Sequence, residues 1–510
     1  MRNSIFFLFI VFAISLTSCR EDFDFEQSSG NLEFSRDTVY LDTVFTNIGS
    51  STYRLKVYNR SNKDISIPTI KLGRSDSKYR MMIDGAQGID GKTFNNVELL
   101  AKDSLFIFIE TTIDYNEFAG ADAQFLYTDQ IQFDAGSNLQ TVELVTLVKD
   151  AYFIYPNRVN GVYEAVDFGQ DENGATTQII GRTLQENHPV NGDEFNWNND
   201  KPYVIYGYAS VPADKTLNIN AGARIHFHAD SGIIVQDGGS LKINGSQSTT
   251  EALENEVILE GDRLESAFSD VPGQWGFIYL RQGSKEHSVT NLTLKNATIG
   301  FLLFGNNGLE NPTADLTLEN VQIYNSANSG ILSQGGYISG KNVVINYAGS
   351  SALYCNLGGK YNFTHSTFNN NWSGTNKFAL RIDNYINQGE TTYPLIDTKF
   401  ENCIIYSTNQ NGLALDYEDD GQPFSPIFSK CIIKLSTSSN VTNNPLYAFM
   451  ADETNITREN PRFLNANQNN LMIGEDSAAR NFGNNLGGND IKGNLRTTTP
   501  DVGAYNYIPE

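Results

Sequence analysis

The hexapeptide Leu318-Glu319-Asn320-Val321-Gln322-Ile323 decides how most of this chain folds, because variants of it recur along the sequence. The third positions of the copies are 296, 320, 342, 365, 402 and 430, so successive copies are 24, 22, 23, 37 and 28 residues apart. A period of about 22 to 24 residues predicts one coil of a three-sided solenoid, and the longer steps predict loop insertions at its corners. The other five copies are Leu294–Ile299, Gly340–Ile345, Phe363–Phe368, Phe400–Ile405 and Phe428–Ile433.

Further apolar runs continue the pattern, as in Gly330–Ser333 and Gly412–Leu415. One coil cannot bury its apolar face, but stacked coils share a continuous core. At ~4.8 Å per coil, about ten coils would form a rod on the order of 45–50 Å long. Cys403 and Cys431 occupy the same phase as Val321, which predicts small buried hydrophobic residues and no redox or metal role.

Glycine-punctuated strand patterns precede the hexapeptide copies, in Leu217–Phe227, Gly238–Gly245 and Val257–Gly261. Together with Trp275-Gly276 and the ending Pro500–Tyr505, these segments resemble the right-handed parallel β-helix (pectate-lyase-like) superfamily. The resemblance implies that residues 202–510 form a right-handed parallel β-helix solenoid with a C-terminal extension. It is specific for fold and does not define an activity.

Residues 27–150 alternate apolar and polar residues in short runs, for example in Tyr53–Tyr58 and Val142–Leu147. Such alternation predicts half-buried strands of a β-sandwich. The stretch Asp42–Gly49 resembles the immunoglobulin-like modules of bacterial surface proteins, so we expect an N-terminal immunoglobulin-like β-sandwich and an all-β protein. Residues 151–201 are mixed and polar, and we interpret them as a connector or a cap on the first coil.

The N-terminus has the pattern of a targeting segment. The apolar run Ile5–Leu16 is too short to cross a membrane of ~30 Å as a helix, so residues 1–19 are interpreted as a signal peptide. Leu16-Thr17-Ser18-Cys19 resembles a bacterial lipobox, which implies lipid attachment at Cys19. The acidic segment 20–26 is similar to the surface-export signal of lipoproteins in Bacteroidetes-like bacteria. The alternatives are an ordinary signal peptide with a chance cysteine and a solvated linker.

The formal net charge of −23 argues against nucleic acid as a partner, because phosphate binding requires clustered lysine and arginine. We expect a membrane partner through the lipid, an outer-membrane or cell-surface location, and a monomer. A polysaccharide or a surface protein is the expected ligand.

Acidic residues follow the run Leu413–Leu415 and suggest a sugar-handling groove. Arg381, Asp383, Asp416 and Asp419 would share one face of the solenoid and are the candidate catalytic residues. Paired carboxylates suit glycoside hydrolysis, whereas a lyase needs a cation to neutralise a uronate. Oxygen ligands at this density could also hold Ca²⁺, although the spacing lacks the pattern of a calcium loop. The simpler alternative is a solvated loop.

Two further sets of residues suggest binding. His226 and His228 lie two positions apart on one strand face, and Asp230 could complete a weak metal site, with a polar outer face as the alternative. Trp275, Tyr279 and Trp372 are expected to be exposed and to stack on pyranose rings, as are Tyr203, Tyr206 and Tyr208. The alternative is that these rings pack between coils.

Three functions remain open from the sequence. The preferred hypothesis is a membrane-anchored lipoprotein whose β-helix binds a glycan or an envelope or host partner without catalysis. The first alternative is a polysaccharide lyase or glycoside hydrolase with its groove on the β-helix face. The second alternative is a structural protein of the envelope.

Overall fold

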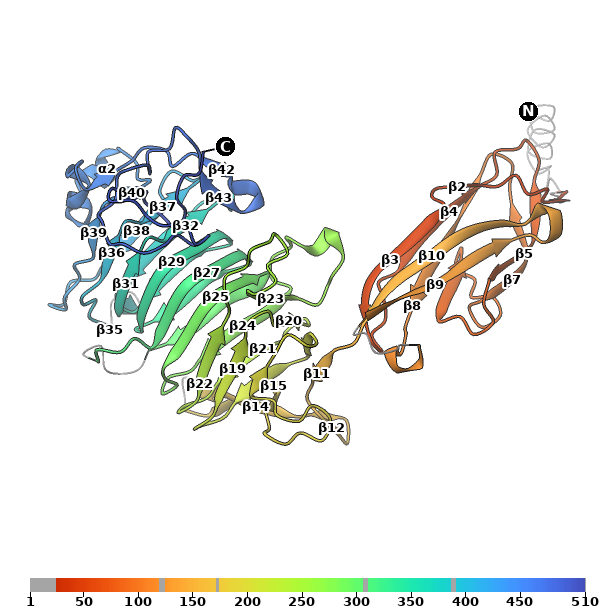
Figure 1. The fold of residues 1–510 in the computed structure, drawn as a ribbon, viewed down its shortest axis with the longest axis horizontal. Helices are drawn as coiled ribbons and strands as arrows, with labels where there is room; N and C mark the ends of the chain where they lie inside the picture. The colour runs from red at the N-terminus through yellow and green to blue at the C-terminus, as the bar shows by residue number, and fades with distance from the viewer. Residues whose placement is uncertain (1–23, 119–123, 171–173, 306–310, 387–390, 510) are drawn as a thin grey trace, which may run out of the picture. The chain divides into compact units, whose positions relative to one another are not determined.

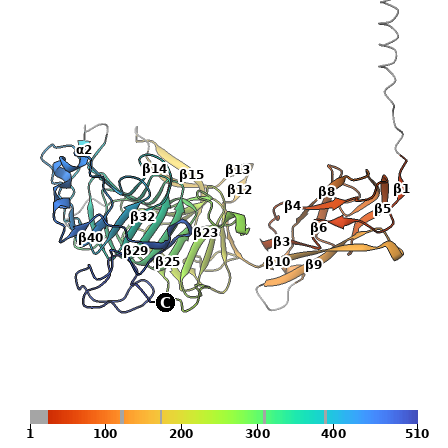
Figure 2. The same cartoon turned by 90° about the horizontal axis from the view of Figure 1, so that it is seen from above.

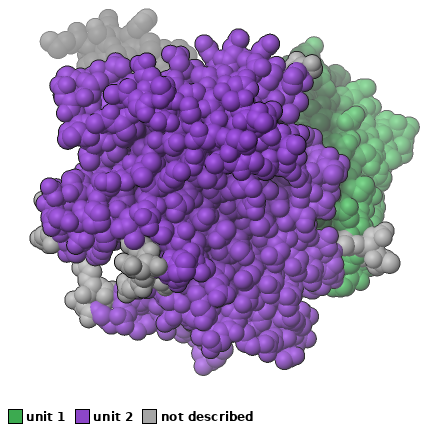
Figure 3. Space-filling model, turned by 60° about the vertical axis from the view of Figure 1, so that its left-hand side comes forward, with its two compact units in different colours: residues 1–150 green, residues 151–510 purple. Residues whose placement is uncertain are grey.

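The computed structural model describes residues 24–118, 124–170, 174–305, 311–386 and 391–509, and nearly all of their regular secondary structure is β-strand (Figure 1). The chain divides into two compact units, Met1–Asp150 and Ala151–Glu510, which are coloured separately in Figure 3. Within the described ranges, no helix is long and apolar enough to cross a membrane. The expected signal peptide and lipid attachment at Cys19 lie outside the described residues.

Unit 1 consists of two sheets that share one hydrophobic core. Most strand pairs are antiparallel, and burial alternates along the strands, as in β10. The first sheet contains β1 (Glu26–Gln27), β5 (Ile65–Leu72), β9 (Gln124–Phe133), β10 (Gln140–Lys149), β3 (Thr38–Phe45) and β7 (Thr93–Leu99). The second sheet contains β2 (Glu33–Phe34), β4 (Tyr53–Tyr58), β8 (Ser104–Thr111) and β6 (Tyr79–Ile83).

Unit 2 is a solenoid of stacked coils joined by parallel strand pairing, which confirms a β-helix-like fold. Its narrow sheet has ten strands: β14 (Ala165–Gln170), β15 (Thr176–Thr183), β18 (Tyr208–Val211), β21 (Gly232–Val235), β24 (Trp275–Leu280), β26 (Ala297–Phe304), β28 (Ser329–Gln334), β30 (Ser351–Asn356), β33 (Phe378–Asp383) and β38 (Leu413–Asp416). All its pairs are parallel except that of β14 with β15.

The other sheet of the solenoid, the wide sheet, has 17 strands. It begins with β11 (Tyr152–Ile154), β16 (Asn196–Trp197), β17 (Tyr203–Ile205), β19 (Thr216–Asn220), β20 (Arg224–Phe227), β22 (Ser240–Asn244), β23 (Val257–Gly261), β25 (His287–Lys295), β27 (Leu316–Ser326) and β29 (Tyr337–Ala348). It continues with β31 (Lys360–Thr364), β32 (Thr367–Asn370), β36 (Lys399–Glu401), β37 (Ile404–Ser407), β39 (Ile427–Ser429), β40 (Cys431–Ile433) and β41 (Ile456–Thr457).

The wide sheet covers two sides of each coil, and a left-handed residue forms the corner between them. Strand β25 pairs with both β22 and β23. The single strand β25 therefore spans two sides of its coil, which separate strands form in the preceding coil. Asparagine tolerates the left-handed conformation better than most residues, which explains why the hexapeptide repeats an asparagine at its third position. The corner residues are Asn291 (φ 46°), Asn320 (55°), Asn342 (52°), His365 (46°), Asn402 (54°) and Lys430 (53°).

One predicted copy of the hexapeptide is wrong, because Leu294–Ile299 does not lie at the same position of its coil as the other copies. Val289 pairs with Leu318 and Leu292 with Val321, so the true copy in this coil is 289–294. Asn296 misled the alignment because it is also left-handed, with φ 67°, although it lies at another position of the coil. The predicted burial of the cysteines is confirmed, since Cys403 and Cys431 are fully buried in the inner core.

Both ends of the solenoid are covered. Strands β11 and β16, from the expected connector, pair in parallel with β17 and β19. At the other end, α2 (Ser439–Thr442) and the 3₁₀ segment η5 (Pro445–Ala451) pack Met450 and its neighbours against the inner core. The C-terminal segment, which includes β42 (Phe463–Asn465) and β43 (Asn470–Ile473), packs on the outer face of the wide sheet. In Figure 2 this segment and the β14–β15 hairpin lie on opposite sides of unit 2.

Small elements complete the structure, and one of them, the strand β34 (Tyr385–Ile386), contributes Tyr385 to the site described below. They are the hairpins β12 (Arg158–Val159) with β13 (Val162–Tyr163) and β34 (Tyr385–Ile386) with β35 (Thr391–Thr392), and the 3₁₀ turns η1 (Tyr115–Glu117), η2 (Gly136–Asn138), η3 (Ser266–Phe268) and η6 (Ala466–Gln468).

Candidate functional site

The outer face of the narrow sheet brings together four of the residues that the sequence singled out, Tyr279, Arg381, Asp383 and Asp416. Alternate residues of a strand point to opposite faces, and Leu280, Leu303 and Ile382 point into the core. The residues directly before and after these core residues in the sequence therefore point outward and form two rows that run from coil to coil. The first row is Tyr279, Leu302, Leu332, Tyr354, Arg381 and Ala414. The second row is Arg281, Phe304, Gln334, Asn356, Asp383 and Asp416.

At one end of these rows, Asp383 is the centre of a hydrogen-bond network. Its carboxylate accepts a hydrogen bond from the Tyr354 hydroxyl at 2.7 Å and from the Asn356 amide at 2.6 Å. The Arg381 guanidinium lies 3.2 Å from Asp383 Oδ2 and 4.7 Å from the centre of the Tyr354 ring. Asp383 is 2% exposed. The network therefore holds a buried carboxylate in a single position, beside a cation that is still half-exposed.

The neighbouring carboxylate, Asp416, is exposed and faces the same side. It pairs in register with Asp383 on the adjacent strand, and it accepts a hydrogen bond from the Tyr385 hydroxyl at 2.8 Å. This hydrogen bond is the largest cause that raises the pKa of Tyr385 to about 12. Asp419 lies further along in an exposed loop, where it accepts from the Tyr417 hydroxyl at 2.8 Å. Arg381, Asp383 and Asp416 are thus brought together, whereas Asp419 contacts other residues.

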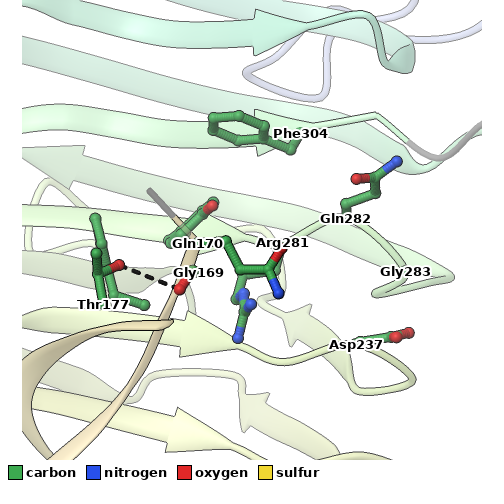
Figure 4. A pocket seen from close by; sticks show the side chains of 10 residues that line it. Gly169, Gln170, Thr177, Asp237, Arg281, Gln282, Gly283 and Phe304 are labelled. Carbon is green, nitrogen blue, oxygen red and sulfur yellow. Dashed lines mark hydrogen bonds between the residues drawn. The ribbon is translucent and has the colours of Figure 1, made fainter. Parts of the chain in front are cut away.

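At the other end of the rows, a pocket of about 720 Å³ opens between strands β24 and β26 of the narrow sheet and the β14–β15 hairpin that begins this sheet (Figure 4). The hairpin contributes Phe168, Gln170 and Thr177, and the sheet contributes Tyr279, Arg281 and Phe304. The ring centre of Tyr279 lies 5.4 Å from that of Phe168 and 5.5 Å from that of Phe304. The pocket therefore combines aromatic faces with amide, hydroxyl and guanidinium groups.

Polar contacts fasten the hairpin to the sheet at this pocket. The Arg281 guanidinium forms an ion pair with Asp167 Oδ2 at 3.1 Å and donates a hydrogen bond to the Gln236 side chain. The Gln236 amide in turn donates to the Asp167 carbonyl at 3.0 Å. Figure 4 shows Thr177 and Gly169, whose hydroxyl and carbonyl hydrogen-bond at 3.2 Å, on the hairpin that faces Arg281.

The expectation of exposed stacking aromatics is wrong for most of these residues. Trp275 is 1% exposed: it stacks on Phe227 with ring centres 4.2 Å apart, and its indole nitrogen donates to the Lys295 carbonyl. Tyr203 and Tyr208 are also buried: Tyr203 stacks on Trp197 in the inner core, whereas Tyr208 packs with Val166 in the outer cluster beneath the hairpin. Tyr206 is half-buried and stacks on His228.

Two of the predicted ligand-binding aromatics keep some accessible surface. Tyr279 is 8% exposed, and this remaining edge faces the pocket. Trp372 is half-buried and lies against Tyr347, with ring centres 5.1 Å apart. The alternative that aromatic rings pack the coils is therefore the better description of Trp275, whereas Tyr279 belongs to the pocket.

The weak metal site suggested for His226, His228 and Asp230 is not assembled. His226 is buried, with Nδ1 3.8 Å from Glu260, while His228 pairs with Asp262 at 2.7 Å and not with Asp230. The hydrogen bond to Asp262 is the largest cause that raises the pKa of His228. Among the residues that the structure describes, no group of three histidine, cysteine, aspartate or glutamate side chains is placed to hold a metal ion.

Sequence reasoning missed Tyr354, Asn356, Tyr385, Phe304 and Phe168. The strand alternation around Cys355 could have placed Tyr354 and Asn356 beside Arg381, since all three share one outward parity. Phe168 had no such signal, because its place in the pocket depends on how the hairpin folds back onto the sheet.

Comparisons with known proteins do not assign this chain to a family. No protein-family model and no curated protein sequence matches the chain. One similar solved structure is the catalytic unit of a thermostable GH87 α-1,3-glucanase from Streptomyces thermodiastaticus strain HF3-3, which is 11% identical over 74% of this chain and 72% of the glucanase, with a TM-score of 0.27.

A second similar structure is a family 123 glycoside hydrolase from Clostridium perfringens, which is 9% identical over 24% of this chain. The match spans only 26% of that hydrolase, and its TM-score is 0.17. A third, the periplasmic chaperone SfaE, is 14% identical over 23% of this chain and 57% of the chaperone, with a TM-score of 0.15. Similarities this low indicate neither a shared site nor a shared activity, so the family of this chain is not established by them.

Proposed function

We propose that unit 2 binds a glycan along the outer face of its narrow sheet. The observation that carries this proposal is the continuous strip formed by the two outward rows, from the pocket at Tyr279 and Phe304 to the carboxylates Asp383 and Asp416. A pyranose ring presents apolar C–H faces and a rim of hydroxyls. Aromatic and aliphatic side chains match the faces, and convergent amide, guanidinium and carboxylate groups match the hydroxyls.

The strip also has the fixed geometry that binding requires. Gln334 donates to Asn356 at 3.2 Å, and Asn356 donates to Asp383, so the polar groups of successive coils orient one another. Strand pairing fixes the spacing between these groups at ~4.8 Å. Little conformational entropy is lost when a ligand meets a surface that is already ordered in this way.

The anchoring and location of the chain are part of the same proposal. The lipobox-like sequence ending at Cys19 and the acidic segment after it support a lipoprotein of the outer membrane or cell surface. Unit 1, for which we retain the proposal of an immunoglobulin-like module, would act as a spacer for a right-handed β-helix. We propose a monomer with no nucleic-acid partner, which the net charge of −23 supports.

Hydrolysis of a glycan at Asp383 and Asp416 is the second candidate function. The two carboxylates lie in register on adjacent strands, which places their backbones ~4.8 Å apart. Retaining glycosidases hold two carboxyl groups about 5–5.5 Å apart. Hydrolysis is favoured over a lyase reaction because the nearby cation, Arg381, is already paired with Asp383 and is not free to neutralise a uronate.

A glycan screen of the purified chain tests both functions. Plant, algal and host polysaccharides are tested by affinity electrophoresis, by reducing-end release and by absorbance near 235 nm for unsaturated uronates, each with and without Ca²⁺. Retardation without product supports the binding function, and weaker retardation of Arg381→Ala assigns it to this face. Asp419→Asn is the matched control, because Asp419 is an exposed carboxylate outside the strip.

The same screen separates the alternatives. Release of reducing ends that is lost in Asp416→Asn and kept in Asp419→Asn would establish the hydrolase and replace the binding function. Absence of both retardation and product on every polymer would contradict the glycan proposal and leave a protein partner or a structural role in the envelope.

A further inference from the structure

The outward rows of the narrow sheet end abruptly at the β14–β15 hairpin. Beyond Tyr279 the first row continues with Ile234 and Ser210, which point away from the inner core but are only 0% and 2% exposed. Ile234 is covered because Val166 and Phe168 of the hairpin pack on it in a separate outer cluster, together with Ile179 and Tyr208. The Ser210 hydroxyl accepts a hydrogen bond from the Gln236 amide at 3.0 Å. From Leu302 onward the same row is half-exposed.

The pocket lies where the covered and uncovered parts of the row meet. The hairpin forms one wall through Phe168, Gln170 and Thr177, and the last uncovered coils form the floor through Tyr279 and Phe304. The ion pair between Arg281 and Asp167 fixes the hairpin at this position. A linear ligand that follows the strip from Asp383 would travel four strand spacings, about 19 Å, and would then meet this wall.

The charges in the pocket select a class of sugar. Among the described residues that line it, the only cation is Arg281, and its charge is balanced by Asp167. Asp237 adds a carboxylate to the rim. A uronate or a sulfated sugar would therefore meet net negative charge, whereas a neutral hexose can stack on Tyr279 or Phe304 and exchange hydrogen bonds with Gln170 and Thr177.

We propose that this pocket receives the terminal residue of a neutral glycan, so that the protein recognises chain ends and not internal segments. The inference rests on the proposed glycan-binding function and names the substrate class and the binding mode of the same face. The hairpin is the determinant of this specificity, because it closes a strip that would otherwise continue along the coils of β21 and β18.

The first test compares chain lengths with the unaltered protein. The probe is a neutral glucan retained in the screen, depolymerised to fractions of decreasing mean length and compared at equal sugar mass by affinity electrophoresis. Recognition of ends predicts that halving the mean length halves the mass concentration needed for half-saturation, since the number of ends doubles. Recognition of internal segments predicts no gain, and that result would overturn the proposal.

The second test either fills the pocket with a larger side chain or removes an aromatic side chain that lines it. Thr177→Trp would occupy the space between hairpin and sheet, and we expect at least a tenfold loss of affinity for a labelled neutral hexaose. Phe304→Ala would remove one stacking face, and we expect a loss of about five- to tenfold. Tyr155→Ala is the control, since Tyr155 is an aromatic residue that is 57% exposed and lies outside the pocket.

The outcomes distinguish this inference from the proposed function. Unchanged affinity in Thr177→Trp and Phe304→Ala, together with weaker binding by Arg381→Ala, would retain glycan binding and overturn the recognition of chain ends. Equal or tighter binding of an oligogalacturonate of the same length would overturn the assignment to neutral sugars. Failure of the unaltered protein to bind any glucan or other glycan would overturn both the inference and the proposed function.

Discussion

Unit 1 includes pairs of strands that are distant in sequence, whereas most strands of unit 2 pair with their equivalents in the neighbouring coils. In unit 1, Val39 of β3 pairs with Leu144 of β10, and the two sheets share one core. In unit 2, Leu318 pairs with Gly340 of the next coil, and the pattern repeats along the solenoid. Nearest-neighbour coupling lets a solenoid lose structure locally, while a two-sheet core is expected to unfold as a whole.

The two units also differ in their response to acid. All five histidines of the chain, at 188, 226, 228, 287 and 365, belong to unit 2. Burial lowers the pKa of His287 and of His365 to about 3 in each case. Both units consist of β-strands, but they differ in strand pairing and in their buried histidines. We therefore expect mutation and pH to change the stability of the two units in different ways.

The largest effect is expected from Trp275→Ala. This change removes a fully buried side chain that stacks on Phe227, and cavities of this kind cost about 3–5 kcal/mol. Chemical denaturation followed by a fluorescence probe in each unit should show a lower midpoint for unit 2 only. Trp372→Ala, which truncates a half-buried indole, is the control and should cost less. An equal shift of the unit 1 transition would contradict the expectation that the effect of this cavity is confined to the solenoid.

Mild acid should destabilise unit 2 and spare unit 1. Since His287 and His365 have lowered pKa values in the folded state, the unfolded chain binds protons first as the pH falls below ~6.5. Stability that is present above pH ~6.5 is then lost toward pH 3, at a rate that approaches about 1.4 kcal/mol per histidine per pH unit.

His228 acts in the opposite direction, because its raised pKa contributes stability below pH ~6.5 that is lost as the pH rises through the raised value. Calorimetry at pH 7.0 and 5.5 measures the balance. His287→Gln should reduce the pH dependence of the unit 2 transition. A unit 2 transition that does not change between these pH values would show that the two buried histidines do not control it.

In unit 1, Tyr79→Phe should weaken the contact between the two sheets. The Tyr79 hydroxyl, on β6, lies 3.0 Å from both the Tyr127 carbonyl and the Thr146 hydroxyl of the other sheet. Its removal leaves buried partners unsatisfied, and we expect a loss of about 1.5 kcal/mol. Tyr53→Phe removes an exposed hydrogen bond to Asp42 and serves as the control. Amide hydrogen exchange should increase across both sheets, and an increase confined to β6 would argue against a single cooperative unit.

The smallest effect is expected at the corner of one coil. Asn320 has φ 55°, so Asn320→Ala should cost about 1 kcal/mol, while Asn320→Gly should cost clearly less because glycine adopts this conformation without strain. Hydrogen exchange should increase only in β25, β27 and β29, the strands of the adjoining coils. If the alanine and glycine variants were equally destabilised, the conformation of the corner would not be the reason for the asparagine.

Local patterns allowed much of the fold to be predicted. The spacing of the hexapeptide identified the coils from Leu318 onward, and its apolar positions identified the inner core, including Cys403 and Cys431. The error at Leu294–Ile299 arose because two asparagines of the same coil, Asn291 and Asn296, are both left-handed. Sequence alone could not decide which of them pairs with Asn320, since pairing depends on the neighbouring coil.

The candidate site was predicted in part. Arg381, Asp383 and Asp416 follow strand parity, and the structure places them on one face. Alternation along one strand could not predict how exposed Trp275 and Tyr279 are, because the side chains that cover them belong to other segments. Phe227 of the preceding coil covers Trp275, and Phe168 of the hairpin covers Tyr279.

The sequence by itself determined the period of the solenoid, the residue type at its corners and the face on which the carboxylates lie. These features depend on backbone conformation and on alternation along one strand, which a local pattern specifies. Only the tertiary structure decided that the β14–β15 hairpin lies over Ile234 and Tyr279 and ends the strip at a pocket. The physical reason is that burial of an outward side chain depends on which distant segment packs upon it, and no local pattern encodes that contact.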